Sequence, residues 1–256
     1  MLAWAAGAGL ETAVIGLGSN LLVSDEGNDG VVIRLAGELA RIERDEDRVT
    51  CGGGASLAAI VKRATEWGLS GIEFGCAIPG TAGGAVRMNA GAFGGEIRDV
   101  LAEALVIGAE GQRRGGPDAL GMTYRRSEIV PGEVVAEAVL ELRRDDPARI
   151  RETVADMQRR RRDAQPAKVR TFGSVWKNPG GERTAGRLLE ECGLKGYVVG
   201  GARISPVHAN FIENHDGARS ADVIALMQEA RRRARARGVE LEHEVQMLGP
   251  IGLLDL

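Results

Sequence analysis

The sequence lacks the features of several protein classes. Cysteine is rare, with only Cys51, Cys76 and Cys192 in 256 residues, an odd number without paired spacing. That pattern argues against a disulfide framework or a zinc site, and it fits buried thiols in a reducing cytoplasm. No apolar run reaches the roughly 18 residues that span a bilayer, and the start of the chain has no basic flank of the kind a secretory signal carries. We therefore expect a cytoplasmic protein that binds no membrane and no metal.

Lysine is also scarce, because Lys62, Lys168, Lys177 and Lys195 are the only four and arginine supplies the other permanent positive charges. Three of the four fall within one stretch of the second half, which favours a site that needs a compact ammonium group, such as a phosphate contact. The net charge of −3 does not favour binding to a polyanion, so we expect no nucleic-acid partner. The length allows one large domain or two unequal ones.

Short strands dominate the first part of the chain, up to about residue 143. One helix stands out there, because apolar residues recur at helical spacing over 57–67, with Ser56 as N-cap and Gly68 as the stop. Five other segments alternate or run apolar between polar turns and are predicted to be strands: 30–35, 39–45, 47–53, 101–109 and 133–142.

The second part of the chain is predicted to be more helical. An amphipathic helix begins at Asp146-Pro147 and ends before Pro166, which puts a domain boundary near residue 145. Two further helices are expected over 184–193, capped by Thr184, and over 221–237, capped by Ser220. The arginines at the end of the last helix complement the helix dipole, which we prefer to a nucleic-acid patch as their explanation.

Two glycine-rich stretches point to a ligand. In "GLGSN", residues 16–20, the spacing resembles a Rossmann loop, but Leu21 stands where the third glycine is needed and a strand follows instead of a helix. The turn can still present successive N–H groups to an anion, with Ser19 and Asn20 as added donors. Residues 79–95 hold six more glycines, which suits a backbone that a bulky ligand approaches closely. Together the two stretches predict a dinucleotide site.

Six motifs, in order from about residue 14 to 249, resemble those of the UDP-N-acetylenolpyruvoylglucosamine reductase family, or MurB family, in the shorter subclass that lacks a substrate-covering insertion. They are "GLGSNLLV", "GIEFGCAIPGTAGGAVRMNAGAFGGEI", "YRRSE", "GSVWKNP", "AGRLLEECGLKGYVVGGARISPVHANFIEN" and "LEHEVQMLG". The resemblance implies an α+β fold. It implies an FAD-binding PCMH-type domain over 1–145, with two α+β subdomains divided near residue 48, and a smaller α+β substrate-binding domain over 146–256.

The same resemblance implies the reaction. Such an enzyme uses NADPH and non-covalently bound FAD to reduce the enolpyruvyl ether of UDP-N-acetylglucosamine to UDP-N-acetylmuramate. The product enters peptidoglycan synthesis, so the enzyme serves cell wall formation, cell shape and division. We expect it to act as a monomer.

That chemistry requires a cation for the substrate carboxylate and a proton donor opposite the flavin. The motifs imply that Arg125 polarises the carboxylate, that Ser174 donates the proton and that Glu244 lies near the same carboxylate. Substrate contacts are implied for Tyr124, Lys177, Asn178, His208 and Asn210, with Lys177 and Asn178 at the diphosphate. FAD contacts are implied for Gly16, Gly18, Ser19, Asn20, Leu21, Pro79, Gly80, Thr81, Gly83, Gly84, Asn89, Ala90 and Gly91.

Each of these side chains also has a purely structural explanation. Glu244 belongs to a run in which polar and apolar residues alternate, so taken alone it is typical of a solvated strand residue. Taken alone, Arg125 is typical of a surface loop, and Ser174 is typical of a turn or a helix cap. His208 reads as a hydrogen-bonded structural histidine. The order of the motifs favours the functional interpretation for the first three residues, and favours it less for His208. Nothing in the sequence indicates a function for His215 or His243.

Two alternatives stay open at this point. Family members carry a further segment before the first glycine loop, and Met1 falls within the expected first helix, so either the natural start lies upstream or part of the first subdomain is missing. The loss of a strand would expose a sheet edge and weaken cofactor binding. The chain could then be a flavin-free binder of nucleotide sugars, whereas the other alternative is a related FAD oxidoreductase with another substrate.

Overall fold

The computed structural model describes residues 1–181 and 183–252. Its contacts divide the chain into two compact units: residues 1–17 with 30–161, and residues 18–29 with 162 onward. We describe each unit by itself. Both mix helices and strands, which confirms the α+β fold class. The domain limits expected from the sequence, 1–145 and 146–256, stay a prediction.

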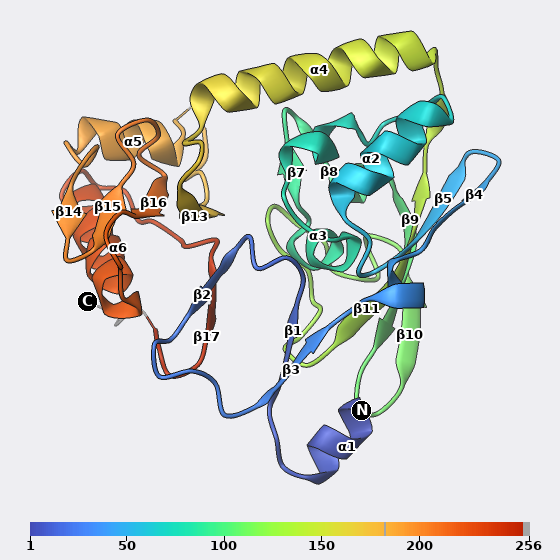
Figure 1. The fold of residues 1–256 in the computed structure, drawn as a ribbon, viewed down its shortest axis with the longest axis horizontal. Helices are drawn as coiled ribbons and strands as arrows, with labels where there is room; N and C mark the ends of the chain where they lie inside the picture. Colours follow the sequence, from blue (N-terminus) through green and yellow to red (C-terminus); the bar gives the residue numbers. More distant parts are fainter. Residues whose placement is uncertain (182, 253–256) are drawn as a thin grey trace. The chain divides into compact units, whose positions relative to one another are not determined.

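A five-stranded antiparallel sheet in the order β10-β9-β11-β5-β4 forms the centre of unit 1 (Figure 1). Apolar side chains from its middle strands, among them Cys51, Val106 and Leu140, are buried in one core with those of the helices. Three of its five strands, β5, β9 and β11, were predicted with nearly these limits, because their apolar residues are concentrated on the buried face. The strands are β4 (Ile42–Asp45), β5 (Arg48–Gly52), β9 (Leu101–Ile107), β10 (Gln112–Gly115) and β11 (Val134–Glu141).

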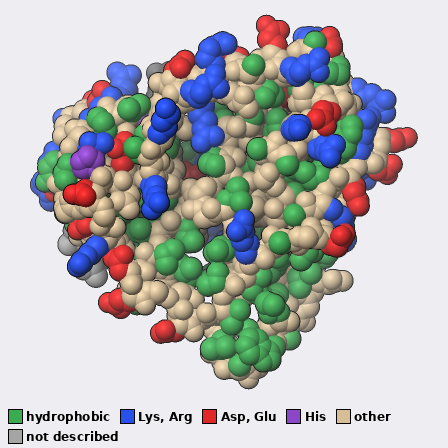
Figure 2. Space-filling view, viewed as in Figure 1, with side chains coloured by type: hydrophobic (Ala, Val, Ile, Leu, Met, Phe, Trp, Pro, Cys, Tyr) green, Lys and Arg blue, Asp and Glu red, His purple; other side chains and the backbone are tan. Residues whose placement is uncertain are grey.

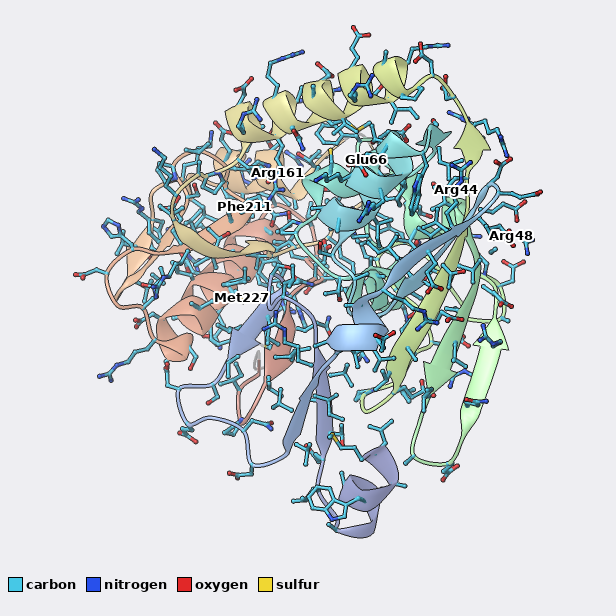
Figure 3. The ribbon with its side chains drawn as sticks, turned by 45° about the vertical axis from the view of Figure 1, so that its right-hand side comes forward. Arg44, Arg48, Glu66, Arg161, Phe211 and Met227 are labelled. Carbon is cyan, nitrogen blue, oxygen red and sulfur yellow. The ribbon has the colours of Figure 1, made fainter. Side chains whose placement is uncertain are left out.

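The strand predicted over 39–45 is wrong in its first half. Residues 37–40 form the 3₁₀ turn η1 (Gly37–Ala40), and β4 begins only at Ile42. The turn wraps over the glycines that follow β5, since the Leu39 carbonyl accepts a hydrogen bond from Gly54 N at 2.7 Å. Beyond it, the β4–β5 hairpin carries Arg44 and Arg48, which Figure 3 labels.

Two helices of unit 1 flank this sheet. The predicted helix is confirmed as α2 (Leu57–Glu66), in which the Ser56 hydroxyl accepts a hydrogen bond from Ala59 N at 3.2 Å. A second helix, α3 (Ala82–Met88), lies inside the glycine-rich stretch and was not predicted. Thr81 caps its start, and Asn89 ends it in the left-handed conformation with φ +41°.

Smaller elements complete unit 1. Strand β1 (Thr12–Ile15) pairs in parallel with β3 (Val31–Arg34), so the predicted strand over 30–35 is confirmed. The first helix, α1 (Leu2–Gly7), exposes Trp4, and Figure 2 shows apolar side chains gathered over it at the bottom of the view. The others are β6 (Leu69–Ser70), η2 (Glu73–Ala77), β7 (Gly91–Ala92), β8 (Gly95–Glu96), η3 (Ile97–Asp99) and β12 (Arg143–Arg144).

The helix predicted to begin at Asp146-Pro147 and end before Pro166 is confirmed as α4 (Pro147–Ala164), and the chain passes from unit 1 into unit 2 after Arg161. It is rich in arginine, and Ile150 is its one buried residue. Near its end the Arg160 guanidinium lies over the Phe93 ring at 5.0 Å. In the part of the chain that the structure describes, no helix combines the length and apolar character needed to cross a membrane.

Unit 2 is built on a four-stranded antiparallel sheet in the order β13-β16-β15-β14. Helices α5 (Ala185–Glu191) and α6 (Ser220–Arg235) pack on it, with Leu188, Leu226 and Met227 fully buried in the core. Figure 3 labels Met227 of α6 and Phe211 of β16. The strands are β13 (Arg170–Ser174), β14 (Val198–Val199), β15 (Ala202–Ile204) and β16 (Phe211–Asn214), and a separate parallel pair joins β2 (Leu21–Val23) to β17 (Gln246–Leu248).

The caps of the two helices differ from each other. Thr184 caps α5 as predicted, accepting a hydrogen bond from Arg187 N at 3.3 Å. The prediction that Ser220 caps α6 is wrong, because its hydroxyl bonds to Asp25 at 2.9 Å. The Asp25 carboxylate also accepts from Ser220 N at 2.7 Å, so a negative charge from the loop before β3 takes the place of the serine at the helix start.

The cysteines follow the sequence prediction in part. Cys51 is completely buried, and burial raises the pKa of its thiol to about 12. Cys76 and Cys192 are only partly buried. The prediction of buried thiols is therefore confirmed for Cys51 and wrong for the other two.

Candidate active site

Unit 1 contains a pocket between β1, the start of α3 and the middle of the sheet. Apolar walls come from β1, β11 and the loops beside them, and charged groups come from Arg87 and Glu133. The rest of the lining is mostly glycine, together with Thr81. The apolar residues are Val14, Ile15, Leu35, Ile129 and Val135, and the glycines are Gly16, Gly53, Gly54, Gly83 and Gly84.

The glycines have two different roles in shaping this pocket. A Cβ on Gly53 would lie 1.8 Å from the Val135 carbonyl oxygen, and one on Gly83 would lie 3.0 Å from the Gly53 oxygen. These two therefore let α3 and the sheet approach backbone to backbone. At Gly84, by contrast, Thr81 Oγ1 at 3.6 Å is the nearest atom among the described residues. Gly84 leaves its backbone open on the pocket side.

The lining fits part of a dinucleotide. A dinucleotide contains flat rings, hydroxyl groups and phosphates. The pocket has apolar walls that can contact the rings, and glycine backbone and one guanidinium that can bind the polar groups. Arg87 is held by a hydrogen bond from its Nη1 to the Val130 oxygen at 3.1 Å, and burial lowers its pKa. The Glu133 carboxylate is paired with Arg113, whose hydrogen bonds lower the pKa of Glu133. Glu133 also interacts with the Arg87 charge, but its hydrogen bonds go to Arg113 and to Val130 N, so the Arg87 guanidinium is the cation that the pocket offers to an anionic ligand.

The pocket contains Gly16, Thr81, Gly83 and Gly84 of the predicted FAD contacts. Pro79 and Gly80 precede α3, where the Gly80 oxygen accepts from Leu57 N at 3.0 Å, and Asn89, Ala90 and Gly91 follow its other end.

Four further residues line the pocket and were not predicted from the sequence: Gly53, Gly54, Arg87 and Glu133. The run Gly52-Gly53-Gly54 at the end of the strand predicted over 47–53 could have indicated the first two. Arg87 had no such signal, because its helix was itself not predicted.

The first glycine loop is shared between the units, since it belongs to unit 1 up to Leu17 and to unit 2 from Gly18. Gly18 has φ +71°, a conformation that favours glycine, and within the described ranges a Cβ there would meet no atom within 4 Å. Asn20 donates from Nδ2 to the Glu244 backbone oxygen at 3.0 Å, and the backbone oxygen of Asn20 accepts from Gln246 N at 3.0 Å. Leu21 then begins β2, as expected for a loop that does not lead into a helix.

Arg125 lies at the tip of a tight turn in unit 1. Thr123 and Arg126 bond to each other's backbone at 3.0 and 3.1 Å, and Arg125 between them has φ +54°. Its Nη2 donates to the Gly91 oxygen at 2.6 Å, and its guanidinium lies 5.0 Å from the centre of the Tyr124 ring. Tyr124 is 47% exposed. The turn thus presents an arginine and a neighbouring exposed tyrosine from the same short loop.

Ser174 and Glu244 come from segments that lie side by side in unit 2. Ser174 ends β13 opposite Phe211, and Gly173 before it has φ +83°. Val175, the next residue, donates its N–H to the Asn210 oxygen at 2.9 Å and accepts from Glu244 N at 2.7 Å. The segment after Ser174 is therefore flanked by Asn210 on one side and Glu244 on the other.

Lys177 continues the same segment. Its backbone N–H donates to the Glu242 oxygen at 2.9 Å, and its ammonium lies 2.5 Å from the Glu242 carboxylate. The Lys177 side chain is 14% exposed, whereas that of Glu242 is 72% exposed. A solvated carboxylate thus pairs with a nearly buried cation, so an incoming phosphate can replace it. Asn178 accepts from Ala185 N at 3.0 Å and is itself exposed.

The side chains of Asn210 and His208 make most of their contacts with other residues of unit 2. Asn210 is buried, and its amide bonds to both backbone groups of Trp176 at 2.9 Å. The His208 ring lies against Gly186 of α5 and edge-on to Phe211 at 5.0 Å, with Nδ1 accepting from Asn210 N at 3.2 Å. Burial lowers the pKa of His208. These contacts agree with the structural explanation of His208.

Comparisons with known proteins give the following matches. Residues 165–248 match the family described as UDP-N-acetylenolpyruvoylglucosamine reductase, C-terminal domain, and residues 1–114 match an FAD binding domain. UDP-N-acetylenolpyruvoylglucosamine reductase 2 of Symbiobacterium thermophilum is 46% identical over 94% of this chain and 79% of its own length. The enzyme of that name from Paramagnetospirillum magneticum is 44% identical over 92% of this chain and 77% of its own.

A solved structure agrees with these relatives. The crystal structure of UDP-N-acetylenolpyruvylglucosamine reductase (MurB) from Thermus caldophilus matches with a TM-score of 0.85 and 38% identity, covering 96% of this chain and 88% of that chain.

Proposed function

This chain belongs to the UDP-N-acetylenolpyruvoylglucosamine reductase family, and on that premise we propose a role for each residue of its candidate site. The protein is an FAD-dependent oxidoreductase that reduces UDP-N-acetylenolpyruvoylglucosamine to UDP-N-acetylmuramate in peptidoglycan synthesis, with NADPH as co-substrate. The observation that carries the assignment of roles is the packing of the Ser174 segment between those of Asn210 and Glu244.

We propose that the glycine-lined pocket of unit 1 holds part of FAD, with Gly16, Thr81, Gly83 and Gly84 as backbone contacts and Arg87 as an added cation. Ser19 and Asn20 supply donors from the first glycine loop. When bound, FAD carries the hydride from NADPH to the vinyl carbon of the substrate. The protein's part is to hold the reacting groups, exclude water and place charge.

Arg125 is proposed to bind the substrate carboxylate. Addition of hydride to the vinyl carbon sends negative charge toward this carboxylate, so a guanidinium there lowers the energy of the charged intermediate. A planar guanidinium also fits both carboxylate oxygens. Tyr124, exposed beside it, is proposed as a substrate contact.

Ser174 is proposed to donate the proton to the adjacent carbon. A serine hydroxyl is a weak acid, so it can serve only a strongly basic, carbanion-like intermediate and only when it is held in place. The backbone hydrogen bonds of Val175 to Asn210 and Glu244 hold the residue next to Ser174, which supports this role. Glu244, proposed in its protonated form, donates a hydrogen bond to the same substrate carboxylate.

Lys177 and Asn178 are proposed to contact the diphosphate. Lys177 is a nearly buried ammonium whose partner is a solvated carboxylate, which suits exchange for a phosphate. Asn210 and His208 are proposed to support the substrate site by fixing the Trp176 segment and the start of α5.

The test separates the two half-reactions. In Ser174→Ala we expect oxidation of the reduced flavin by substrate to slow by about 10²–10⁴-fold, because a positioned general acid is lost. Reduction of the flavin by NADPH should change little. The matched control is Ser205→Ala, which removes a buried serine of unit 2 that accepts from Val207 N. Equal slowing of both half-reactions in Ser174→Ala would refute the assignment.

We also propose that the enzyme works as a monomer in the cytoplasm, without a nucleic-acid or membrane partner. The net charge of −3 supports the proposal that the enzyme binds no nucleic acid, because it does not favour binding to a polyanion. Sedimentation of the FAD-loaded protein tests the monomer, and a mass twice that of the chain would contradict it.

A further inference from the structure

Asn89 has an unusual position at the end of α3. It is completely buried and lies in the left-handed conformation, with φ +41°. Its Nδ2 donates to the Thr123 oxygen at 2.9 Å, and its Oδ1 accepts from Arg98 N at 3.0 Å. The side chain thus joins the 3₁₀ turn η3 to the loop that contains Thr123.

One of these loops is the turn that carries Arg125. A residue other than glycine with φ near +54° is strained, so its surroundings must hold it there. Two consecutive carbonyls at the start of the turn are fixed, that of Met122 by Arg98 Nη1 at 2.9 Å and that of Thr123 by Asn89. Asn89 makes the second of these bonds itself, and it also binds the backbone N–H of Arg98, the residue that makes the first.

The segment that begins with Asn89 also contacts the guanidinium of Arg125. Arg125 Nη2 donates to the Gly91 oxygen at 2.6 Å, and Nη1 lies 3.5 Å from the Asn89 oxygen. Both carbonyls belong to the short segment that leaves α3 through Asn89. The same residue therefore fixes the backbone under Arg125 and the carbonyl groups that hold its charged end.

We infer that Asn89 is a positioning residue for Arg125. Its two amide atoms serve protein partners in a fully buried position, so its effect on the reaction passes through the arginine, in place of the FAD contact that its motif implied. The inference rests on the proposed role of Arg125 in binding the substrate carboxylate.

Two variants and one control test this. Asn89→Gly keeps a residue that accepts the left-handed conformation while removing both side-chain hydrogen bonds. Asn89→Asp keeps the volume and the acceptor for Arg98 N but loses the donor toward Thr123. The control, Glu46→Gly, replaces another left-handed residue, φ +51°, in the turn between β4 and β5.

We expect Asn89→Gly to slow oxidation of the reduced flavin by substrate by about 100-fold, as for a misplaced binding group. Asn89→Asp should slow this step too. Reduction of the flavin by NADPH and FAD content should stay within about twofold of the unmodified enzyme. In an Arg125→Ala background, Asn89→Gly should have little further effect, because the two changes act on one interaction. The control should leave both half-reactions unchanged.

Hydrogen exchange gives a readout that does not depend on activity. The N–H groups of Thr123 and Arg126 close the turn on each other, so their exchange reports its opening. In the FAD-loaded Asn89→Gly protein both should exchange roughly tenfold faster, since a buried hydrogen bond is lost. Unchanged exchange, or a loss of FAD with equal slowing of both half-reactions, would overturn the inference. If the unmodified enzyme does not oxidise its reduced flavin with substrate, the proposed function fails, while the exchange rates still decide whether Asn89 fixes the turn.

Discussion

Gly84→Ala is expected to act on stability and on cofactor affinity in opposite directions. Gly84 lies in the first turn of α3 and lines the pocket of unit 1. A Cβ there has only Thr81 Oγ1, at 3.6 Å, within 4 Å among the described residues, so the fold has room for a methyl group. The same methyl group would enter the space that we assign to FAD.

The two effects have different sizes. Replacing glycine by alanine inside a helix stabilises it by about 0.5–1 kcal/mol, because the unfolded chain loses backbone freedom. A methyl group forced into a filled contact costs about 1–3 kcal/mol. If FAD touches Gly84, its Kd should therefore rise roughly 5- to 150-fold, while the protein without FAD becomes slightly more stable.

The assay pairs flavin fluorescence titration for the Kd with urea unfolding of the protein freed of FAD. Gly7→Ala is the matched control, because Gly7 ends α1 and a Cβ there meets no described atom within 4 Å. It should leave the Kd unchanged. Gly83→Ala, whose Cβ would lie 3.0 Å from the Gly53 oxygen, should instead destabilise the fold. A Gly84→Ala protein that binds FAD as tightly as the unmodified one would refute our placement of the cofactor.

Two further predictions concern unit 2. Asn210→Ala should lower the free energy of unfolding by roughly 2–4 kcal/mol, because both buried backbone groups of Trp176 lose their partner. A smaller loss of stability together with weakened substrate binding would instead indicate that Asn210 contacts the substrate directly. Hydrogen bonds from Arg232 and then Arg233 lower the pKa of Glu229 from 4.5 to about 2. The contribution of the ionised Glu229 to the free energy of unfolding is therefore fully present above pH 4.5 and disappears as the pH falls toward 2. The melting temperatures of the unmodified protein and of Glu229→Gln should converge over that interval.

Helices with a clear apolar face were predictable. Leu57, Ile60, Val61 and Ala64 fall on one side of α2, and Ser56 caps it as predicted, because these are local properties of ten residues. Helix α3 was not predictable in this way, since Gly83 and Gly84 have low helix propensity. It forms because Thr81 caps it and its apolar residues pack on the sheet, and the second of these depends on the rest of the fold.

The site was predictable only through the order of its motifs. The hydrogen bond from Glu244 N to the Val175 oxygen joins residues far apart in the chain, and the pattern around either one carries no sign of the other. Glu244 alone resembled a solvated strand residue, and Leu241 and Val245 around it are buried as that pattern requires, but Glu244 itself is half-buried and precedes β17, which begins at Gln246. Non-local pairing places Glu244 next to the Ser174 segment, which is information that periodicity does not contain.

The asparagines show where a motif stops being informative. A motif marks the residues that a function needs, but it does not separate those that touch the ligand from those that hold others in place. An amide carries both a donor and an acceptor, so one buried side chain can fix two backbone groups at once, as Asn89 and Asn210 do. Asn20 and Asn178, predicted from the same motifs, are not fully buried. Burial together with the count of internal hydrogen bonds therefore divides the four into two that position and two that can face the ligand, and only a structure supplies both quantities.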